Sequence, residues 1–158
     1  MPTPAPARVE AMRKLAFLEG AWSGEGWFQV GGRKVAVRCS ETVRSKFDGL
    51  VLVVEGRHTA GPAGSERVVH DALGVLTAGD DGAGYAFSTW LANGRGGNHK
   101  GEWKDGAFVW GMENPVQGKV RYTIRLDGQG RWHETGESSP DGGATWTPFF
   151  EMTLSRAK

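Results

Sequence analysis

The sequence predicts an all-β protein, a single ten-stranded antiparallel up-and-down β-barrel with a short N-terminal helix. Apolar and polar residues alternate over many short segments, as they do in strands with one buried face. Turn dipeptides such as Asp105-Gly106 and Asp127-Gly128 separate these segments. The chain contains 25 Gly beside 7 Trp, 7 Phe and 2 Tyr, whereas glycine-rich disordered chains contain few aromatic residues. This combination favours many short strands joined by tight turns.

The first element predicted is a short helix. Residues 1–8 are rich in Pro and Ala, and we expect a flexible N-terminus there. Val9, Met12 and Leu15 then follow helical spacing, and Gly20 would end the helix. Residues 9–158 are predicted to form one barrel domain.

The strands follow, and each has apolar residues at every second position or is bounded by turn residues. The alternation is clearest around Val35–Val43, Val120–Leu126 and Phe150–Leu154. The connections are too short for helical crossovers, so the sheet is antiparallel, and closing it into a barrel removes its edges. The predicted strands are residues 21–30, 33–44, 49–59, 66–76, 83–92, 98–104, 106–113, 118–126, 130–138 and 145–156.

Composition excludes several classes of function. The formal charge is +1, without a block of like charge, so we expect no nucleic-acid or membrane partner. Cys39 is the only cysteine, which rules out an intramolecular disulfide and a cysteine-rich zinc site. The N-terminal residues do not resemble a signal peptide, and no apolar run is long enough to span a membrane. A cytoplasmic location is the expectation.

The segment Leu18–Phe28 combines glycines with large aromatic residues. At a period of two, Trp22, Gly24, Gly26 and Phe28 share one face. Trp22 is predicted to close one end of the barrel, and Phe28 to line the other end. Gly24 and Gly26 are expected to permit a sharp bend of the strand and the close approach of a neighbouring backbone or large ring. They are also expected to leave space inside the barrel, either as a void or as room for a partner ring.

Two motifs carry a resemblance to a known group. Gly20-Ala-Trp22 resembles the Gly-x-Trp signature of the calycins, the lipocalin and fatty-acid-binding-protein group. In that group the Trp closes the barrel floor and an Arg of the last strand packs across it, which implies this role for Arg156. LEGAWSGEG, ETVRSKFDGLVLVVEG and SSPDGGATWTPFFEMTLSR together resemble bacterial lipocalin-like proteins of a domain-of-unknown-function type, over residues 15–156. The resemblance implies a barrel with a cavity but no agreed activity.

The segment Leu18–Gly26 is also similar to the start of the nitrobindins, whose barrels bind haem. Their proximal histidine lies close to the final strand. Here that strand contains Phe149-Phe150-Glu151-Met152 and no histidine, so His133 or His99 would have to serve as axial ligand. Haem is therefore an alternative, and no cofactor is predicted.

Glu41 carries the main functional hypothesis. It is in phase with Val37, Cys39 and Val43, hence on the apolar face, where a carboxylate is costly unless it is paired. Its carboxylate either is solvated at the mouth of the barrel or binds the polar end of a ligand. We expect a small, mainly apolar ligand inside the barrel. The residues predicted to line this site are Phe28, Glu41, Tyr85, Phe87, Tyr122, Trp146 and Phe150.

Three other hypotheses remain open. Glu41 could act as the general base of an enzyme, with its pKa raised by burial. The barrel could instead be filled by its own side chains and serve as an interaction module, with a homodimer as one outcome. A zinc site could assemble from His70, His99 and a carboxylate, although no metal-ligand spacing is present and no metal is predicted.

Overall fold

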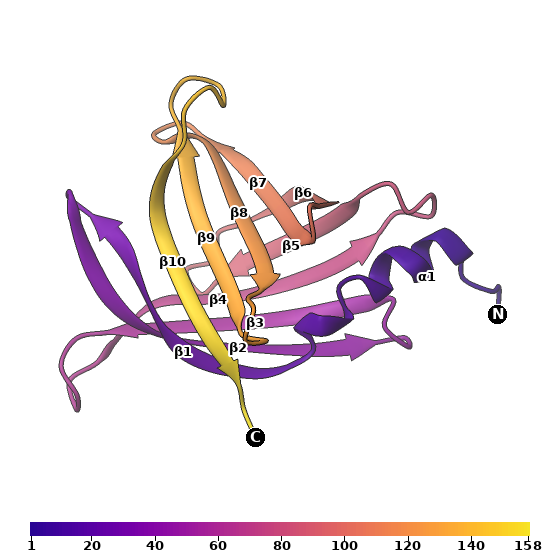
Figure 1. Cartoon of the computed structure of the whole chain (residues 1–158), viewed down its shortest axis with the longest axis horizontal. Helices are drawn as coiled ribbons and strands as arrows, with labels where there is room; N and C mark the ends of the chain where they lie inside the picture. The colour runs from indigo at the N-terminus through magenta and orange to yellow at the C-terminus, as the bar shows by residue number, and fades with distance from the viewer.

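The computed structural model describes residues 1–158 and consists of ten strands preceded by two short helical segments. The ten strands close into one antiparallel barrel, in which β1 pairs with both β2 and β10 (Figure 1). The predicted fold class is confirmed. The elements are α1 Pro6–Arg13, the 3-10 helix η1 Ala16–Leu18, β1 Gly20–Val30, β2 Arg33–Lys46, β3 Val51–Ala60, β4 Arg67–Ala78, β5 Tyr85–Leu91, β6 Gly96–Lys104, β7 Ala107–Asn114, β8 Gly118–Leu126, β9 Trp132–Ser139 and β10 Thr147–Arg156.

The N-terminal helix begins earlier than the sequence predicted. α1 starts at Pro6, because a proline is compatible with the first helical turn, where its missing N–H has no partner in any case. Arg8 pairs with Asp80 at 3.1 Å, so residues 6–8 are part of the folded domain. At eight residues, this helix is too short to cross a membrane.

α1 and η1 lie at the end of the barrel where β2 and β4 finish (Figure 1). The hydroxyl of Tyr85, on β5, donates a hydrogen bond to the carbonyl of Ala11 at 2.8 Å. Met12, Leu15 and Leu18 are buried in the same core as the interior of the strands. This end of the barrel is therefore closed by apolar packing.

Trp22 and Arg156 complete the closed end. The indole Nε1 of Trp22 donates to the carbonyl of Leu18 at 2.9 Å. The guanidinium of Arg156 lies 4.1 Å from the centre of the Trp22 ring, a cation–π arrangement. It also donates hydrogen bonds to the carbonyls of Phe17 and Glu19. Arg156 thus ties the last strand to the segment that precedes β1.

The glycines of β1 permit close contact between strands. A Cβ atom at Gly24 would overlap the carbonyl oxygen of Thr153, and one at Gly26 would overlap that of Glu151, both on β10. The expectation that these glycines leave free space inside is therefore wrong, because the backbone of β10 occupies the position of the missing side chains. The expected role in strand bending and close approach fits this geometry.

Other inward glycines lie under aromatic rings. A Cβ atom at Gly74 would overlap the ring of Phe87, and one at Gly101 would overlap the ring of Phe108. Each ring reaches from the adjacent strand across the glycine, as aromatic residues commonly do in sheets. Packing of large rings against bare backbone therefore explains these two inward glycines, whereas 13 of the 25 glycines have a positive φ.

Candidate ligand site in the open half of the barrel

The half of the barrel far from α1, called the open half below, has inward-facing side chains that are accessible to solvent. His58 and His70 are cross-strand partners whose rings lie 4.8 Å apart, so both face the interior. His58 is buried, whereas His70 is accessible to solvent although protein atoms surround it closely enough to lower its pKa. Trp110 and Tyr122 face the same space and are half-buried. This pattern is expected where water reaches inward-facing side chains through an open mouth.

Glu41 and His58 form a buried polar pair on β2 and β3. Glu41 Oε1 lies 3.2 Å from His58 Nε2, and only 7% of Glu41 and 7% of His58 is exposed. The carboxyl group lies against the backbone of Gly56, its cross-strand partner. A Cβ atom at Gly56 would be 2.6 Å from Oε1 and 2.8 Å from Oε2. Glycine at position 56 therefore provides the space that the carboxyl group occupies.

Burial removes charge from this pair. It raises the pKa of Glu41 to about 8 and lowers the pKa of His58 to about 4, because a charged group is poorly solvated among protein atoms. At neutral pH the carboxyl group therefore retains a proton while the imidazole is neutral. The pair presents a hydrogen-bonding group without net charge.

Glu134, on β9, is a second buried acid. One carboxylate oxygen accepts a hydrogen bond from Trp132 Nε1 at 3.0 Å. Burial and the charge of Glu41 together raise the pKa of Glu134 to about 8. Burial and Glu134 together raise the pKa of Tyr122 to about 12. The charge of Glu41 on β2 therefore influences Glu134 on β9, although the two acids are far apart in the sequence.

Aromatic rings form the walls around these acids. Phe150 stacks on His58, with ring centres 5.8 Å apart and planes 4° apart. Trp110 stacks on Tyr122 at 4.6 Å. The Nε1 atom of Trp110 is buried and has no hydrogen-bond acceptor in the protein, which is uncommon for a buried polar atom. A bound molecule with an oxygen or nitrogen acceptor could satisfy it.

The residues predicted to line one site are divided between two regions. Glu41, Tyr122 and Phe150 meet in the open half, and Phe28 is paired in register with Phe150 on the neighbouring strand. Tyr85, by contrast, is held by the helical end. Phe87 lies between these regions, with its ring against Phe108 and Trp110.

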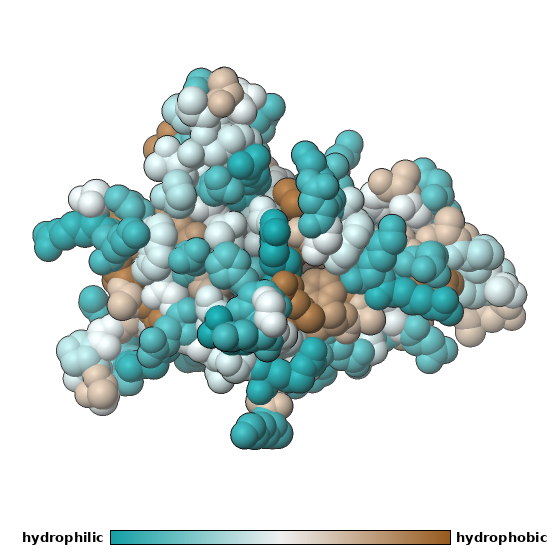
Figure 2. Space-filling model, in the orientation of Figure 1, coloured by the Kyte–Doolittle hydropathy of each residue, from teal (hydrophilic) through white to brown (hydrophobic).

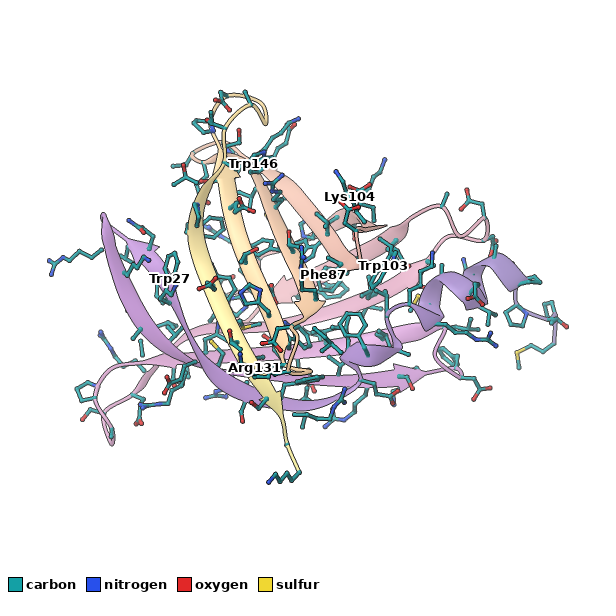
Figure 3. The ribbon with its side chains drawn as sticks, in the orientation of Figure 1. Trp27, Phe87, Trp103, Lys104, Arg131 and Trp146 are labelled. Carbon is teal, nitrogen blue, oxygen red and sulfur yellow. The ribbon has the colours of Figure 1, made fainter.

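Trp146 is not inside the barrel, so that prediction is wrong. Its ring stacks on Arg121, with the guanidinium 3.9 Å from the ring centre, and Arg121 pairs with Glu137 on the outer face. The register of β10 against β9 shifts between Pro148 and Phe150. This bulge reverses the alternation, so Trp146 and Phe150 point to opposite faces. Figure 3 shows Trp146 near the β9–β10 hairpin, away from Phe87.

The two histidines considered as haem ligands face different sides. His133 lies on the outer face of β9, next to inward-facing Glu134, and its ring pairs with Glu151 at 3.2 Å. His133 therefore cannot ligate a group held inside the barrel. His99 faces inward, but its Nε2 is hydrogen-bonded to the hydroxyl of Thr89 at 2.9 Å. No group of three or more His, Cys, Asp or Glu side chains is arranged to hold a metal ion.

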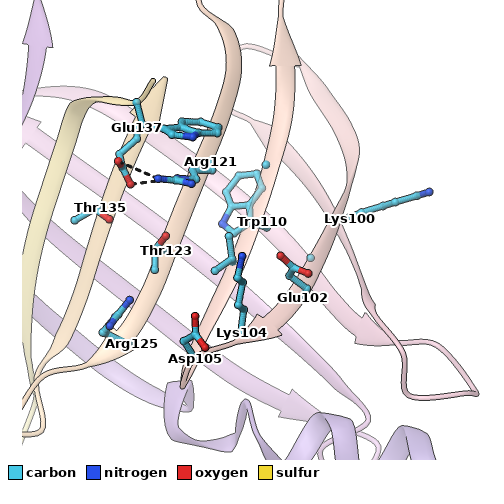
Figure 4. A pocket seen from close by; sticks show the side chains of 14 residues that line it. Lys100, Glu102, Lys104, Asp105, Trp110, Arg121, Thr123, Arg125, Thr135 and Glu137 are labelled. Atoms are coloured by element: carbon cyan, nitrogen blue, oxygen red, sulfur yellow. Dashed lines mark hydrogen bonds and ion pairs between the residues drawn. The ribbon is translucent and has the colours of Figure 1, made fainter. Parts of the chain in front are cut away.

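A separate groove lies on the outer face of β6–β9, with a volume of about 670 Å³ (Figure 4). Its walls are mainly charged side chains, among them Lys104, Arg125 and the Arg121–Glu137 pair. Most of the surrounding surface is hydrophilic (Figure 2). The groove is open to water and its charges are of both signs, so it lacks the enclosed apolar walls that a small apolar ligand requires.

Comparison with known proteins supports the fold. No protein-family model matches the chain, and no curated protein matches it. The crystal structure of Rv2717c from M. tuberculosis is similar, with a TM-score of 0.69 and 14% sequence identity over 99% of this chain and 100% of that one. This similarity extends over the whole barrel. At this level of identity it shows a shared fold alone.

Two residues of the site were missed by the sequence analysis. His58 follows Leu52, Val54 and Gly56 at a period of two, so its inward position could have been found from the alternation. Its pairing with Glu41 could not, because that contact depends on the register of β2 against β3. Trp110 is one of seven tryptophans in the chain, and only the barrel places its ring against Tyr122.

Proposed function

We propose that this protein binds a small, mainly apolar molecule in the open half of the barrel, with the Glu41–His58 pair at its polar end. The observation that carries this proposal is the combination of buried, uncharged polar groups with aromatic walls. Sites for small organic ligands typically have this composition.

The hypothesis of a completely filled barrel has less support. The helical end is filled by the apolar core. At the other end, inward-facing His70, His99 and Tyr122 retain contact with solvent. A barrel filled by its own side chains would bury these residues as completely as Trp22 and Trp132. The open half therefore has the character of a binding site, whereas the closed half stabilises the fold.

A neutral fluorescent dye, N-phenyl-1-naphthylamine, tests the proposal because its emission rises in an apolar environment. We expect the dye to bind and to be displaced by a ligand pool, with the ligand then identified by native mass spectrometry. Thr89 and Ser88 are adjacent residues on β5 that face inside and outside respectively. Thr89→Phe should weaken dye binding by at least about tenfold, since the ring would occupy the site.

Ser88→Phe is the matched control, because it adds the same ring to the outer face, and it should leave dye binding within about twofold of wild type. Circular dichroism would establish that both variants fold. Equal binding by the two variants would place the dye outside the barrel and contradict the proposal. Absence of any bound dye or pool component in the wild type would favour the filled-barrel hypothesis.

A second candidate function is general acid–base catalysis by Glu41. The 3.2 Å contact with His58 and the raised pKa of Glu41, about 8, favour it. 5-Nitrobenzisoxazole opens when a base removes one proton, so it reports such an activity directly. We expect a rate that rises with pH through about 8 and is lost in Glu41→Gln. A pH-independent rate, or one retained by Glu41→Gln, would exclude Glu41 as the base.

A further inference from the structure

The two buried acids also indicate the charge of the ligand. Glu41 and Glu134 are 7% and 8% exposed, and the charge of Glu41 acts on Glu134. Neither forms an ion pair with a lysine or an arginine. The only basic side chain in contact with either acid is His58. The barrel therefore encloses two acidic groups with no permanent positive charge to match them.

The other titratable groups facing these acids do not supply that charge. They are His58 and His70 on β3 and β4, Cys39 on β2 and Tyr122 on β8. Burial lowers the pKa of both histidines to about 4, so they are neutral at pH 7. Burial and the nearby acids raise the pKa of Cys39 and Tyr122 to about 12, so these groups are neutral as well.

The site provides hydrogen-bond acceptors for a ligand that carries donor groups. The ring nitrogens of His70 take part in no hydrogen bond of the protein, and a neutral imidazole has one acceptor nitrogen. Glu134 accepts only the bond from Trp132. An ammonium group has three donors and no acceptor, which matches this arrangement. A carboxylate would instead bring a third acid into the same space with no cation to neutralise it.

The aromatic walls favour the same kind of ligand. Phe150 lies over His58, and Tyr122 lies next to Phe150 with ring centres 6.4 Å apart. The faces of such rings attract cations, and more strongly where water is excluded. They also bury the apolar body of a ligand. Two independent features, the acids without a matching cation and the aromatic rings beside them, therefore point to one ligand class.

We propose that the ligand of the open half is a small apolar or aromatic amine, bound as its ammonium ion between Glu41, Glu134 and the rings of Phe150 and Tyr122. This inference rests on the proposed binding function and defines its ligand class. An acid that is protonated in the free protein must give up its proton to pair with the ammonium group. Binding of the amine therefore releases a proton to the solvent.

Isothermal titration calorimetry with three matched probes tests this proposal. The probes are 3-phenylpropylamine, 3-phenylpropan-1-ol and 3-phenylpropionate, which share an apolar body and differ in charge. We expect the amine to bind at least about tenfold more tightly than the alcohol, and the carboxylate to bind most weakly. Titrations at pH 7 in phosphate and in Tris should reveal release of roughly one proton per amine bound.

Glu41→Gln and Glu134→Gln should each weaken amine binding by at least about tenfold and weaken alcohol binding by a smaller factor, because the amide still forms hydrogen bonds but cannot carry the negative charge. Glu151→Gln is the control, because Glu151 lies on the outer face next to His133, and it should change neither. If one of the two inner variants fails to fold, the other variant and the proton release by the wild type still decide the question.

The outcomes separate this inference from the proposed function. Alcohol binding as tight as amine binding, without proton release, would overturn the amine assignment and leave the binding function intact. Displacement of the neutral dye by none of the three probes would also overturn the assignment. If the dye itself did not bind, the proposed function would fail and the amine assignment with it. Tight amine binding with proton release that depends on both acids would establish the assignment.

Discussion

The two buried acids make the stability of the protein depend on pH in an unusual direction. Burial raises the folded-state pKa of Glu41 and Glu134 from 4.5 to about 8. Between these values the folded protein holds protons that the unfolded chain has lost. The folded state is therefore favoured at low pH, and this stabilisation is lost as pH rises through about 8.

His58 and His70 act in the opposite direction. Burial lowers their folded-state pKa from 6.5 to about 4, so the stabilisation from these groups is present above pH 6.5 and is lost as pH falls toward 4. Between pH 4.5 and 6.5 the effects of the two acids and the two histidines on the free energy of unfolding largely cancel. Between pH 6.5 and 8 only the two acids change, and stability should fall.

The magnitude follows from the width of that interval. One pKa unit corresponds to about 1.4 kcal/mol, so the interval from 6.5 to about 8 gives about 2 kcal/mol for each acid, or about 4 kcal/mol for the pair. This value is an upper limit, because water that enters the open half reduces the cost of ionising the acids. A loss of this size is a large fraction of the stability of an ordinary domain.

Urea denaturation at pH 6.5, 7.5 and 8.5, monitored by tryptophan fluorescence, measures this effect. We expect the free energy of unfolding of the wild type to fall across the series. The Glu41→Gln variant has no titratable group at this position. Its free energy of unfolding should therefore fall by about 2 kcal/mol less than that of the wild type across the same pH interval. Wild-type stability that stays level or rises between pH 6.5 and 8.5 would refute this account of the buried acids, as would parallel pH profiles for the two proteins.

Three other predictions concern single residues. Gly56→Ala should displace the carboxyl group of Glu41, because its Cβ would lie 2.6 Å from Oε1; we expect weaker ligand binding by calorimetry, and unchanged affinity would show that this carboxyl group does not contact the ligand. Arg156→Met should destabilise the protein by about 2 kcal/mol in urea, through loss of the cation–π contact and of two hydrogen bonds; a loss below about 0.5 kcal/mol would mean that the contact is replaced by water. Gly24→Ala should cost more than about 3 kcal/mol or prevent folding, because its Cβ would overlap the backbone of β10; a soluble variant of wild-type stability would show that β1 and β10 can separate at no cost.

Local sequence signals are sufficient to predict the strand pattern and the closed end of the barrel. Alternating faces, turn dipeptides and the lack of room for crossovers leave an antiparallel meander as the simplest fold. Each of these signals is local, since it depends on neighbours within a few residues. The inward position of Glu41 follows from the same local alternation, because Glu41 is in phase with Val37 and Cys39.

The contacts between side chains of different strands depend on the folded barrel. The Glu41–His58 pair depends on strand register, and the action of Glu41 on Glu134 depends on closure of the barrel. Trp146 shows why a local pattern fails here, because one bulge between Pro148 and Phe150 reverses the face of every residue before it. A period of two fixes the relative orientation of neighbours within a strand, but a single inserted residue changes it. Register, bulges and closure depend on the energy of the whole sheet, and only the folded barrel determines them.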